Sequence, residues 1–446
     1  MKYPLFFYIK KHQLVLTIIV IHCLFFTTKI VLGNFFLEDS FEYYHLANNI
    51  KNSFEFYSAD INSAIQFENY TKRPPIYGLF VLIFSFFLNS TISVLIFQNI
   101  LSIASIFICL RLFENYYKNI NKKLLLVLIT SSISQFIYAN YLMSEMFFQF
   151  LIVLLCYFFH QIVTKKTIYQ LVFFQIIIIL LFLTKPVFYL FIVPNIFLCI
   201  WFTKHIKQAY LFSLIPIIVC VLYMNWNHSR TGSYEFSSIQ NINLKNYNLY
   251  YFNLNKYGEA YAKKVDAKVL VLANAKRSYA ERQNEIKNQS TGYIKKDWFS
   301  YSIMHIKGSF RMFLDPGRFD LYNFFEFKNN TEVGFLHHLN KNGAFGALEY
   351  FKQQPLLILL VIPIILLFNI LKLIGFARFW VNNHKTTPMV FWFMLLVIIY
   401  ITTLTGLIGS SRFLVPILPI YILFATLGLS KTKKTNEKSY SYWSRT

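Results

Sequence analysis

The stretch LVLTIIVIHCLFFTTKIVLG, residues 14–33, decides the fold class. It is apolar over about 20 residues, the length at which a helix crosses the hydrocarbon core of a bilayer. The basic residues ahead of it are typical of a secretory signal, but the run is long enough to span and lacks a small-residue cleavage site. We therefore expect an uncleaved first membrane helix.

The whole chain has the composition of a membrane protein. Of its 446 residues, 56% are hydrophobic, 20% aromatic and only 14% charged, against about 25% charged in an average soluble domain. The net charge of +23 is spread over short clusters between apolar runs, which is typical of topology signals and argues against a nucleic-acid partner. The five cysteines lie inside apolar runs without close spacing, so we expect neither disulfides nor a thiolate metal site.

Nine further apolar runs are long enough to cross a bilayer. They lie at 92–112, 124–140, 146–164, 168–184, 187–203, 208–224, 355–374, 388–406 and 413–429. The sequence thus predicts an all-α polytopic membrane protein with about 10 transmembrane helices. Its expected parts are a transmembrane module at 1–224, an extracytoplasmic loop domain at 225–354, C-terminal transmembrane helices at 355–430 and a basic cytoplasmic tail at 431–446.

Two loops have helical patterns of their own. The first outer loop, 34–75, has helix-like apolar spacing, and the apolar piece at 74–89 has only 16 residues, so both are expected to form interfacial or half-inserted helices. In the loop domain, 256–289 is rich in helix formers and predicts a helix. The aromatic and basic stretch at 296–313 is typical of a helix at the membrane surface.

Basic residues segregate between the two sides of this topology. With a cytoplasmic N-terminus, the cytoplasmic segments hold 19 basic residues against two acids, Glu114 and Glu437, out of 43 and 20 in the chain. The positive-inside rule then places both termini in the cytoplasm and both long loops outside.

The first outer loop contains LEDSFEYYHLANNI, residues 37–50, with Glu38, Asp39 and Glu42 at the membrane edge. Acids are costly there, so a chemical role is favoured. Other charged residues fall at the same boundary: Glu145, Lys72, Arg73, Lys185 and Arg412. A carboxylate can take a proton from an incoming hydroxyl while basic groups neutralise a departing phosphate. The pattern therefore predicts transfer from a membrane-bound phosphate ester.

Each charged residue also has a simpler interpretation. Asp39 suits the N-cap of a helix that starts at Ser40, and Glu38 and Glu42 suit solvated positions at a helix start. Lys72, Arg73 and Arg412 suit anchoring to lipid headgroups, and Glu145 suits capping of its own span. His45 lies three residues after Glu42 and six after Asp39, so Asp39, Glu42 and His45 are the candidate ligands of a divalent metal, with a surface histidine as the alternative.

Five short motifs, in order, resemble those of the GT-C glycosyltransferases, which include the protein O-mannosyltransferases and the lipid A aminoarabinose transferases. They are D-S-x-x-Y-x-x-x-A from Asp39, R-P-P-x-Y from Arg73, S-E at Ser144, T-K-P from Thr184, and S-R-F-x-x-P-x-x-P from Ser411. Gly78 stands where that family often has a proline after the tyrosine. The stretch GSYEFSSIQNINLKNYN, 232–248, is similar to the loop after the seventh span of bacterial members.

The resemblance implies transfer of a sugar from a polyprenyl-phosphate donor to a lipid, polysaccharide or protein acceptor, usually with inversion at the anomeric carbon. It implies a bacterial plasma membrane with the active site on the outer face. Asp39 corresponds to the family's catalytic aspartate and Glu145 to its second outer acid, with Glu38 as a further catalytic candidate. Lys72, Arg73, Lys185 and Arg412 are the candidates for holding the donor phosphate. Metal use varies in this family, so a divalent metal stays an open question.

Two other functions remain as alternatives. A glycan ligase or polymerase would use a lipid-pyrophosphate donor and would be expected to carry more outer arginines and a larger outer domain. A lipid-linked sugar flippase or transporter would be expected to show inverted repeats and acids at mid-membrane depth. Here the acids lie at one face and no repeat is visible.

Overall fold

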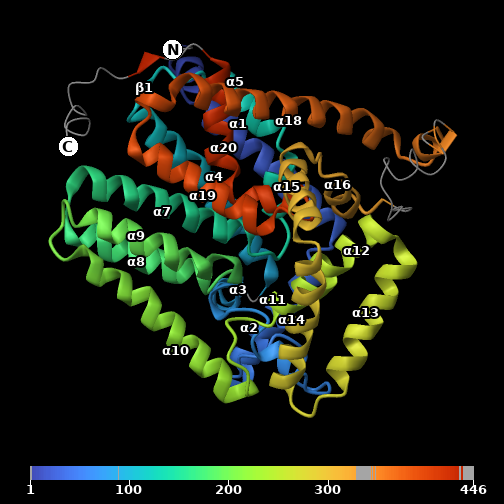
Figure 1. Ribbon diagram of the computed structural model, residues 1–446. Coiled ribbons are helices and arrows are strands. Elements are labelled where there is room, and N and C mark those ends of the chain that lie inside the picture. Colours follow the sequence, from blue (N-terminus) through green and yellow to red (C-terminus); the bar gives the residue numbers. More distant parts are fainter. Residues whose placement is uncertain are drawn as a thin grey trace.

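The computed structural model describes residues 3–88, 90–327, 343, 345–346, 348–430 and 433–434. These residues are mostly helical (Figure 1), as expected for an all-α protein. Within the described part of the chain, the one pair of strands is β1 (Tyr117–Lys118) with β2 (Lys433–Lys434), antiparallel with Tyr117 opposite Lys434. Most of the predicted basic tail at 431–446, and the part of the loop domain at 328–342, lie outside the described residues.

Six described helices are long and apolar enough to cross a membrane. They are Gln13–Leu32 in α1 (Tyr3–Leu32), α4 (Thr91–Glu114), α7 (Glu145–Lys165), η3 with α10 (Ala209–Ser213, Leu214–Thr231), α18 with η5 (Leu356–Asn383, His384–Thr386), and η6 with α20 (Ser411–Ile417, Leu418–Leu429). This set is consistent with a multi-pass membrane protein.

The other predicted spans are shorter helices. They are α8 (Ile168–Phe182), η2 with α9 (Pro186–Phe191, Ile192–Phe202) and α19 (Met389–Thr405). The run at 124–140 is divided into α5 (Lys122–Thr130) and α6 (Ile133–Tyr138). Between them the hydroxyls of Ser131 and Ser132 donate to the Leu128 carbonyl at 3.0 and 2.8 Å, competing with regular helical bonding. The helices therefore do not by themselves establish ten full-length spans.

The apolar core is centred on α7, which packs against α4, α8, α19 and η6. The rings of Phe159 and Phe393 stack at 4.0 Å between centroids, with 3° between their planes. Helices α18 and α20 approach closely at two glycines. A Cβ on Gly428 would overlap the backbone carbonyl of Gly375, so this crossing requires a residue without a side chain.

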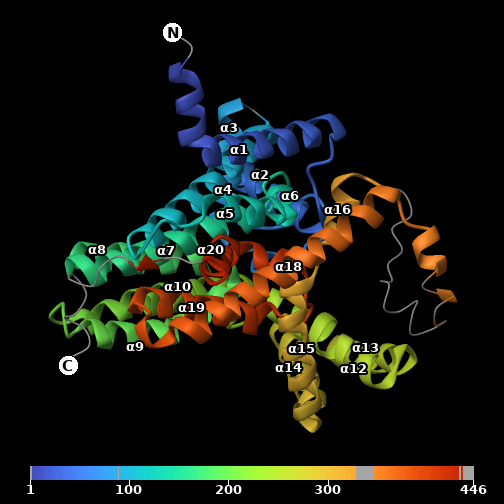
Figure 2. The ribbon, with the colours of Figure 1, turned by 90° about the horizontal axis from the view of Figure 1, so that it is seen from above.

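The loop domain forms a group of helices on the side of the bundle away from β1 (Figures 1 and 2), and its last two helices, α15 and α16, pack against the bundle. In chain order these are α11 (Ile239–Asn243), the π-helical turn η4 (Leu244–Leu249), α12 (Tyr250–Tyr257), α13 (Glu259–Asn274), α14 (Tyr279–Lys296), α15 (Trp298–Leu314) and α16 (Arg318–Phe324). Their small core contains Leu249, Val265 and Val269.

The helices predicted in this domain are found with one correction. The stretch at 296–313 forms α15, with Trp298 and Phe310 largely exposed. The stretch at 256–289 is broken twice, at Gly258 between α12 and α13 and again before α14, where Ser278 and Glu281 form a capping box. Ser278 Oγ accepts the Glu281 backbone N–H at 3.2 Å and the Glu281 carboxylate accepts that of Ser278 at 3.3 Å, which starts a new helix.

The helices expected within 34–89 are present. Helix α2 (Glu38–Ser53) is followed by the short turn η1 (Phe67–Tyr70) and by α3 (Pro75–Leu88). Both α2 and α3 pack on each other through buried Tyr43, Ala47, Tyr77 and Val81. This packing holds the start of α2 next to the residues that precede α3.

Candidate active site

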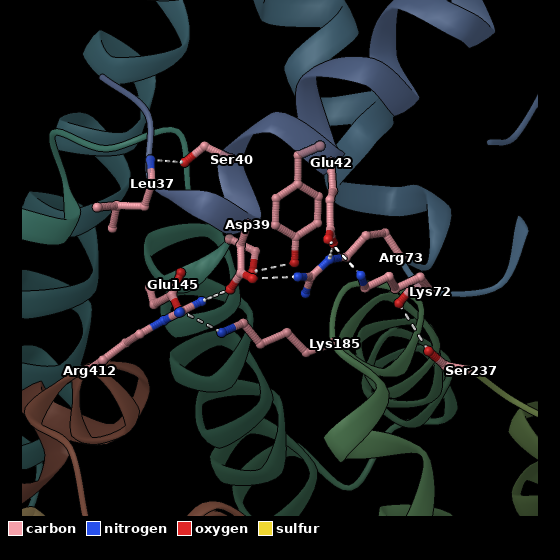
Figure 3. Close-up of polar contacts among 12 residues, drawn as sticks. Leu37, Asp39, Ser40, Glu42, Lys72, Arg73, Glu145, Lys185, Ser237 and Arg412 are labelled. Atoms are coloured by element: carbon pink, nitrogen blue, oxygen red, sulfur yellow. Dashed lines mark hydrogen bonds and ion pairs between the residues drawn. The ribbon is translucent and has the colours of Figure 1, made fainter. Parts of the chain in front are cut away.

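Asp39 is the second residue of α2, and its side chain points toward Arg73 and Arg412 and does not cap the helix (Figure 3). The Leu37 backbone N–H donates to Ser40 Oγ at 2.9 Å, so the hydroxyl of Ser40 supplies the bond that closes this helix end. The capping role considered for Asp39 is therefore not found. Its two carboxylate oxygens instead accept hydrogen bonds from two arginines.

The first arginine comes from the residues before α3. Arg73 Nη2 lies 2.6 Å from Asp39 Oδ1, and its Nε lies 2.5 Å from Glu42 Oε2. Lys72 Nζ lies 2.9 Å from the other oxygen of Glu42. The guanidinium of Arg73 also lies 5.0 Å from the centre of the Tyr43 ring. One turn of α2 therefore fixes both consecutive basic residues.

The second arginine comes from the other end of the chain. Arg412 Nη2 lies 2.5 Å from Asp39 Oδ2, and its Nε lies 2.6 Å from Glu145 Oε1. Lys185 Nζ is 2.9 Å from the same oxygen of Glu145. Glu145 is fully buried at the start of α7, and its Oε2 has no hydrogen-bond partner among the described residues. A fixed guanidinium fork thus joins the start of α2 to the start of α7.

Together these side chains form one alternating chain of charges, which Figure 3 shows. We call it the charge network; its members are Lys72, Glu42, Arg73, Asp39, Arg412, Glu145 and Lys185. Four cations face three carboxylates, which leaves a net charge of +1. A partly buried cluster with excess positive charge and Arg forks suits a bound phosphate.

The charge network sets the protonation of its members. Burial acts to raise the pKa of Asp39, but the charges of Arg73 and Arg412 outweigh it and hold that pKa well below its usual range. Burial lowers the pKa of Lys185, partly offset by Glu145. In this state Asp39 is ionised but weakly basic, because both arginines stabilise its anion.

Two acids that the sequence reasoning missed hold the Arg412 turn in place. Asp315 accepts the Ser411 backbone N–H at 2.6 Å. Asp320 accepts the Ser411 hydroxyl at 2.5 Å and the Tyr138 hydroxyl at 2.6 Å. Burial raises the pKa of Asp320 to about 6, although both hydrogen bonds act against the shift. The only sequence signal was the pair of acids around Pro316 and Gly317.

A third missed acid lies in the loop after α10. Glu235 Oε1 accepts the Thr71 hydroxyl at 2.8 Å and the Tyr279 hydroxyl at 2.9 Å, while its buried Oε2 has no partner in the described part of the chain. Burial raises the pKa of Glu235, partly offset by these two hydrogen bonds. Glu235 stands in the quoted stretch at 232–248, but its partners could not be seen there.

The charge network opens on a cavity of about 1420 Å³. Four of its members, Asp39, Arg73, Lys185 and Arg412, line this cavity together with Glu38. Glu38 forms no ion pair within the described residues. The structure thus brings together all the predicted phosphate-binding residues and the catalytic candidates Asp39 and Glu145, and leaves Glu38 at the cavity wall.

The metal candidates do not form a ligand set. Within the described residues no group of three or more His, Cys, Asp or Glu side chains is placed to hold a metal ion. Asp39 and Glu42 are paired with Arg73, and the ring of His45 packs edge-on against that of Tyr44, with 6.1 Å between ring centroids. The arrangement of Asp39, Glu42 and His45 therefore does not fit a divalent cation.

Comparison of the chain with protein-family models, with curated proteins and with solved structures finds no match.

Proposed function

We propose that this chain is a membrane glycosyltransferase that moves a sugar from a polyprenyl-phosphate donor to an acceptor hydroxyl. One observation carries the proposal: a net-positive network of three carboxylates and four cations faces a 1420 Å³ cavity at the ends of apolar helices. The resemblance of the motifs that contain these residues to those of GT-C glycosyltransferases also supports it.

The cavity lining suits an amphiphilic donor. Beside the charged residues it includes the apolar side chains Val187, Leu190, Leu404, Leu407 and Ile408. Leu190, Leu404 and Ile408 also remain about two-fifths exposed, at 43, 39 and 39%. In the proposed complex the apolar prenyl chain lies along these apolar residues, and the anionic phosphate contacts Arg73 and Arg412.

Donor binding would also activate Asp39. A phosphate that takes hydrogen bonds from Arg73 and Arg412 competes with the carboxylate for the same donors. The pKa of Asp39 then rises from its depressed value, because the new anion cancels the charges that lowered it. Asp39 becomes a better base when the donor is bound, which limits unproductive chemistry in its absence.

The proposed reaction balances as a displacement at the anomeric carbon. The acceptor oxygen forms a bond to that carbon while its proton passes to the Asp39 carboxylate. The bond between the anomeric carbon and the phosphate oxygen breaks, and its electron pair leaves with the polyprenyl phosphate. Arg412, Arg73 and Lys185 stabilise the charge that develops on this leaving group. By resemblance to the family, the product has inverted anomeric configuration.

The proposal includes the topology expected from the sequence. It places about ten membrane crossings in a bacterial plasma membrane, both termini in the cytoplasm and the charge network on the outer face. The shorter helices α8, α9 and α19 then cross together with their flanking turns.

Comparative mass spectrometry of cells with and without the gene tests this function. We expect loss of one sugar from an envelope glycan, lipid or protein, and accumulation of the matching polyprenyl-phosphate sugar. Accumulation of a glycan on polyprenyl pyrophosphate would instead indicate a ligase or polymerase. Movement of a lipid-linked sugar across the membrane without covalent transfer would indicate a flippase. Unchanged envelope and lipid-linked sugars would contradict all three.

A further inference from the structure

The cavity has a second wall whose chemistry differs from that of the charge network. This wall is formed by residues 235–248 and by α14, and we call it the amide wall. Six amide side chains of this region line the cavity: Gln240, Asn241, Asn243, Asn248, Gln283 and Asn284. Charged residues at this wall are Glu235 and Lys287, one of each sign. The wall is therefore polar but close to neutral.

Several hydrogen-bonding groups of the amide wall are unused within the protein. Asn241 donates to Gln283 at 3.0 Å, and Asn248 donates to the Asn243 carbonyl at 2.9 Å. The side chains of Gln240, Asn243 and Asn284 have no hydrogen-bond partner among the described residues. Each amide offers donors and acceptors together, which matches the hydroxyls of a polyol.

Glu235 adds a buried acceptor to the same wall. The side chain is 8% exposed, and both of its hydrogen bonds fall on Oε1, while Oε2 has no partner in the described chain. A buried carboxylate oxygen without a partner is costly, and a ligand hydroxyl would remove that cost. Glu235 lines the cavity, but Oε2 itself is buried, so a ligand hydroxyl reaches this oxygen only after the Glu235 side chain turns toward the cavity.

Two tyrosines extend the amide wall outward. Tyr247 lines the cavity, and its ring is nearly parallel to that of Tyr251 on α12, with 9° between planes and 6.1 Å between centroids. The two residues are 38% and 43% exposed. Exposed, flat aromatic faces beside hydrogen-bonding amides suit the apolar faces and hydroxyl edges of sugar rings.

We propose that the amide wall is the acceptor site and that the acceptor is a neutral glycan, with Tyr247 and Tyr251 stacking on its sugar rings. The proposal rests on the proposed glycosyl transfer and names its acceptor class. An anionic glycan would meet Glu235 without a matching excess of cations at this wall. A lipid acceptor would need a wall with few hydrogen-bonding groups, whereas the amides here outnumber the apolar lining residues Phe236, Ile239 and Leu244 of the same wall.

Binding to the purified full-length chain in nanodiscs tests the proposal. The probes are neutral hexasaccharides of glucose, mannose, galactose and rhamnose, uronate hexasaccharides, and a Ser- and Thr-rich peptide, all followed by saturation-transfer NMR. We expect at least one neutral glycan to bind best. Gln240→Ala with Asn284→Ala, and Tyr247→Ala with Tyr251→Ala, should each weaken its binding by about tenfold or more, since several hydrogen bonds or a ring platform are lost.

Asn52→Ala is the matched control, because Asn52 is an exposed amide on α2 that does not line the cavity, and this variant should bind the neutral glycan as the unmodified chain does. Preferred binding of the uronates or the peptide, binding of no neutral glycan, or unchanged binding by the amide-wall variants would each overturn the proposal. Binding of undecaprenyl phosphate to the same nanodiscs is measured in parallel. Its absence would contradict the proposed donor site while leaving glycan binding at the amide wall intact, so the two failures are distinguishable.

Discussion

Replacing Arg412 by glutamine should disable the charge network with limited damage to the fold. The guanidinium joins Asp39 and Glu145 through hydrogen bonds of 2.5 and 2.6 Å and lines the cavity. Its loss takes the net charge of the network from +1 to 0 and removes a donor to the departing phosphate. Loss of one such preorganised donor costs about 3–4 kcal/mol in the transition state, which is about 100- to 1000-fold in kcat/KM.

The effect on stability should be smaller. Glu145 keeps Lys185 at 2.9 Å, and Asp39 keeps Arg73 at 2.6 Å, so neither acid is left alone. We expect a loss of about 1–3 kcal/mol in unfolding free energy, below the roughly 3–5 kcal/mol for stranding a buried charge. Arg412→Lys keeps the charge but cannot bond to both acids at once as a guanidinium does. Its activity should lie between those of the unmodified chain and Arg412→Gln, about tenfold below the unmodified chain.

Transfer of labelled sugar from a polyprenyl-phosphate donor, in membranes with equal amounts of folded protein, measures this effect. Lys51→Gln is the matched control, because Lys51 is an exposed cation on α2 that does not line the cavity. It should keep activity within about twofold, since exposed charges contribute little. An Arg412→Gln variant within about threefold of the unmodified chain would refute the role of Arg412 as a leaving-group donor.

Three further outcomes are expected. Burial raises the pKa of Asp320 to about 6, above its ordinary 3.8, so the contribution of Asp320 to folding stability is greatest below pH 4 and is lost as pH rises through 6. The melting temperature of the unmodified chain should therefore fall relative to that of Asp320→Asn between pH 4 and 6. A difference in melting temperature that stays constant over this range would contradict the prediction. Gly428→Ala should lower the unfolding free energy by about 2 kcal/mol or more, because the added Cβ meets the Gly375 carbonyl. Gly292→Ala in α14 is the control: a Cβ there meets open space, so thermal unfolding should show a neutral or stabilising effect. Equal effects of the two substitutions would contradict the close crossing of α18 and α20. EDTA should leave transfer within about twofold, because Asp39 and Glu42 are already paired with cations; a large loss restored by Mg²⁺ or Mn²⁺ would show that metal is needed.

The members of the charge network could be predicted from the sequence because membrane topology limits where charges are placed. Asp39, Glu145, Lys185 and Arg412 each stand at an end of an apolar run, and the proposed topology puts those ends on one side. Which acid meets which base could not be predicted. Arg412 reaches Asp39 across 373 positions of the chain, and tertiary packing, including that of η6 against α7 and of α2 against α3, determines that contact.

The helix boundaries that differ from expectation lie where serine hydroxyls bond to the backbone in place of the group expected there. Asp39 and Ser40 both suit a helix start, and the hydroxyl of Ser40 closes it, which leaves the carboxylate free for the arginines. Apolar length alone predicted one span at 124–140. It did not weigh Ser131 and Ser132, whose hydroxyls bond to the preceding turn.

The missed acids share one feature: their partners are far away in the sequence. Asp320 is held by Tyr138 and Ser411, and Glu235 by Thr71 and Tyr279. From the sequence alone, an acid in a long loop between apolar runs is expected to be an ordinary solvated residue. Its burial, and with it the raised pKa, follows only from the tertiary contacts of the loop domain.

The most direct test of the account is sugar transfer by Asp39→Asn, with Asp60→Asn as the control at an exposed carboxylate outside the cavity lining. Both proteins are assayed with saturating labelled donor at equal amounts of folded protein. Loss of the base predicts a fall in kcat of about 100- to 10,000-fold for Asp39→Asn, with undecaprenyl-phosphate binding retained, and no change for Asp60→Asn. Transfer by Asp39→Asn at an undiminished rate would contradict the assignment of Asp39 as the acceptor-activating base.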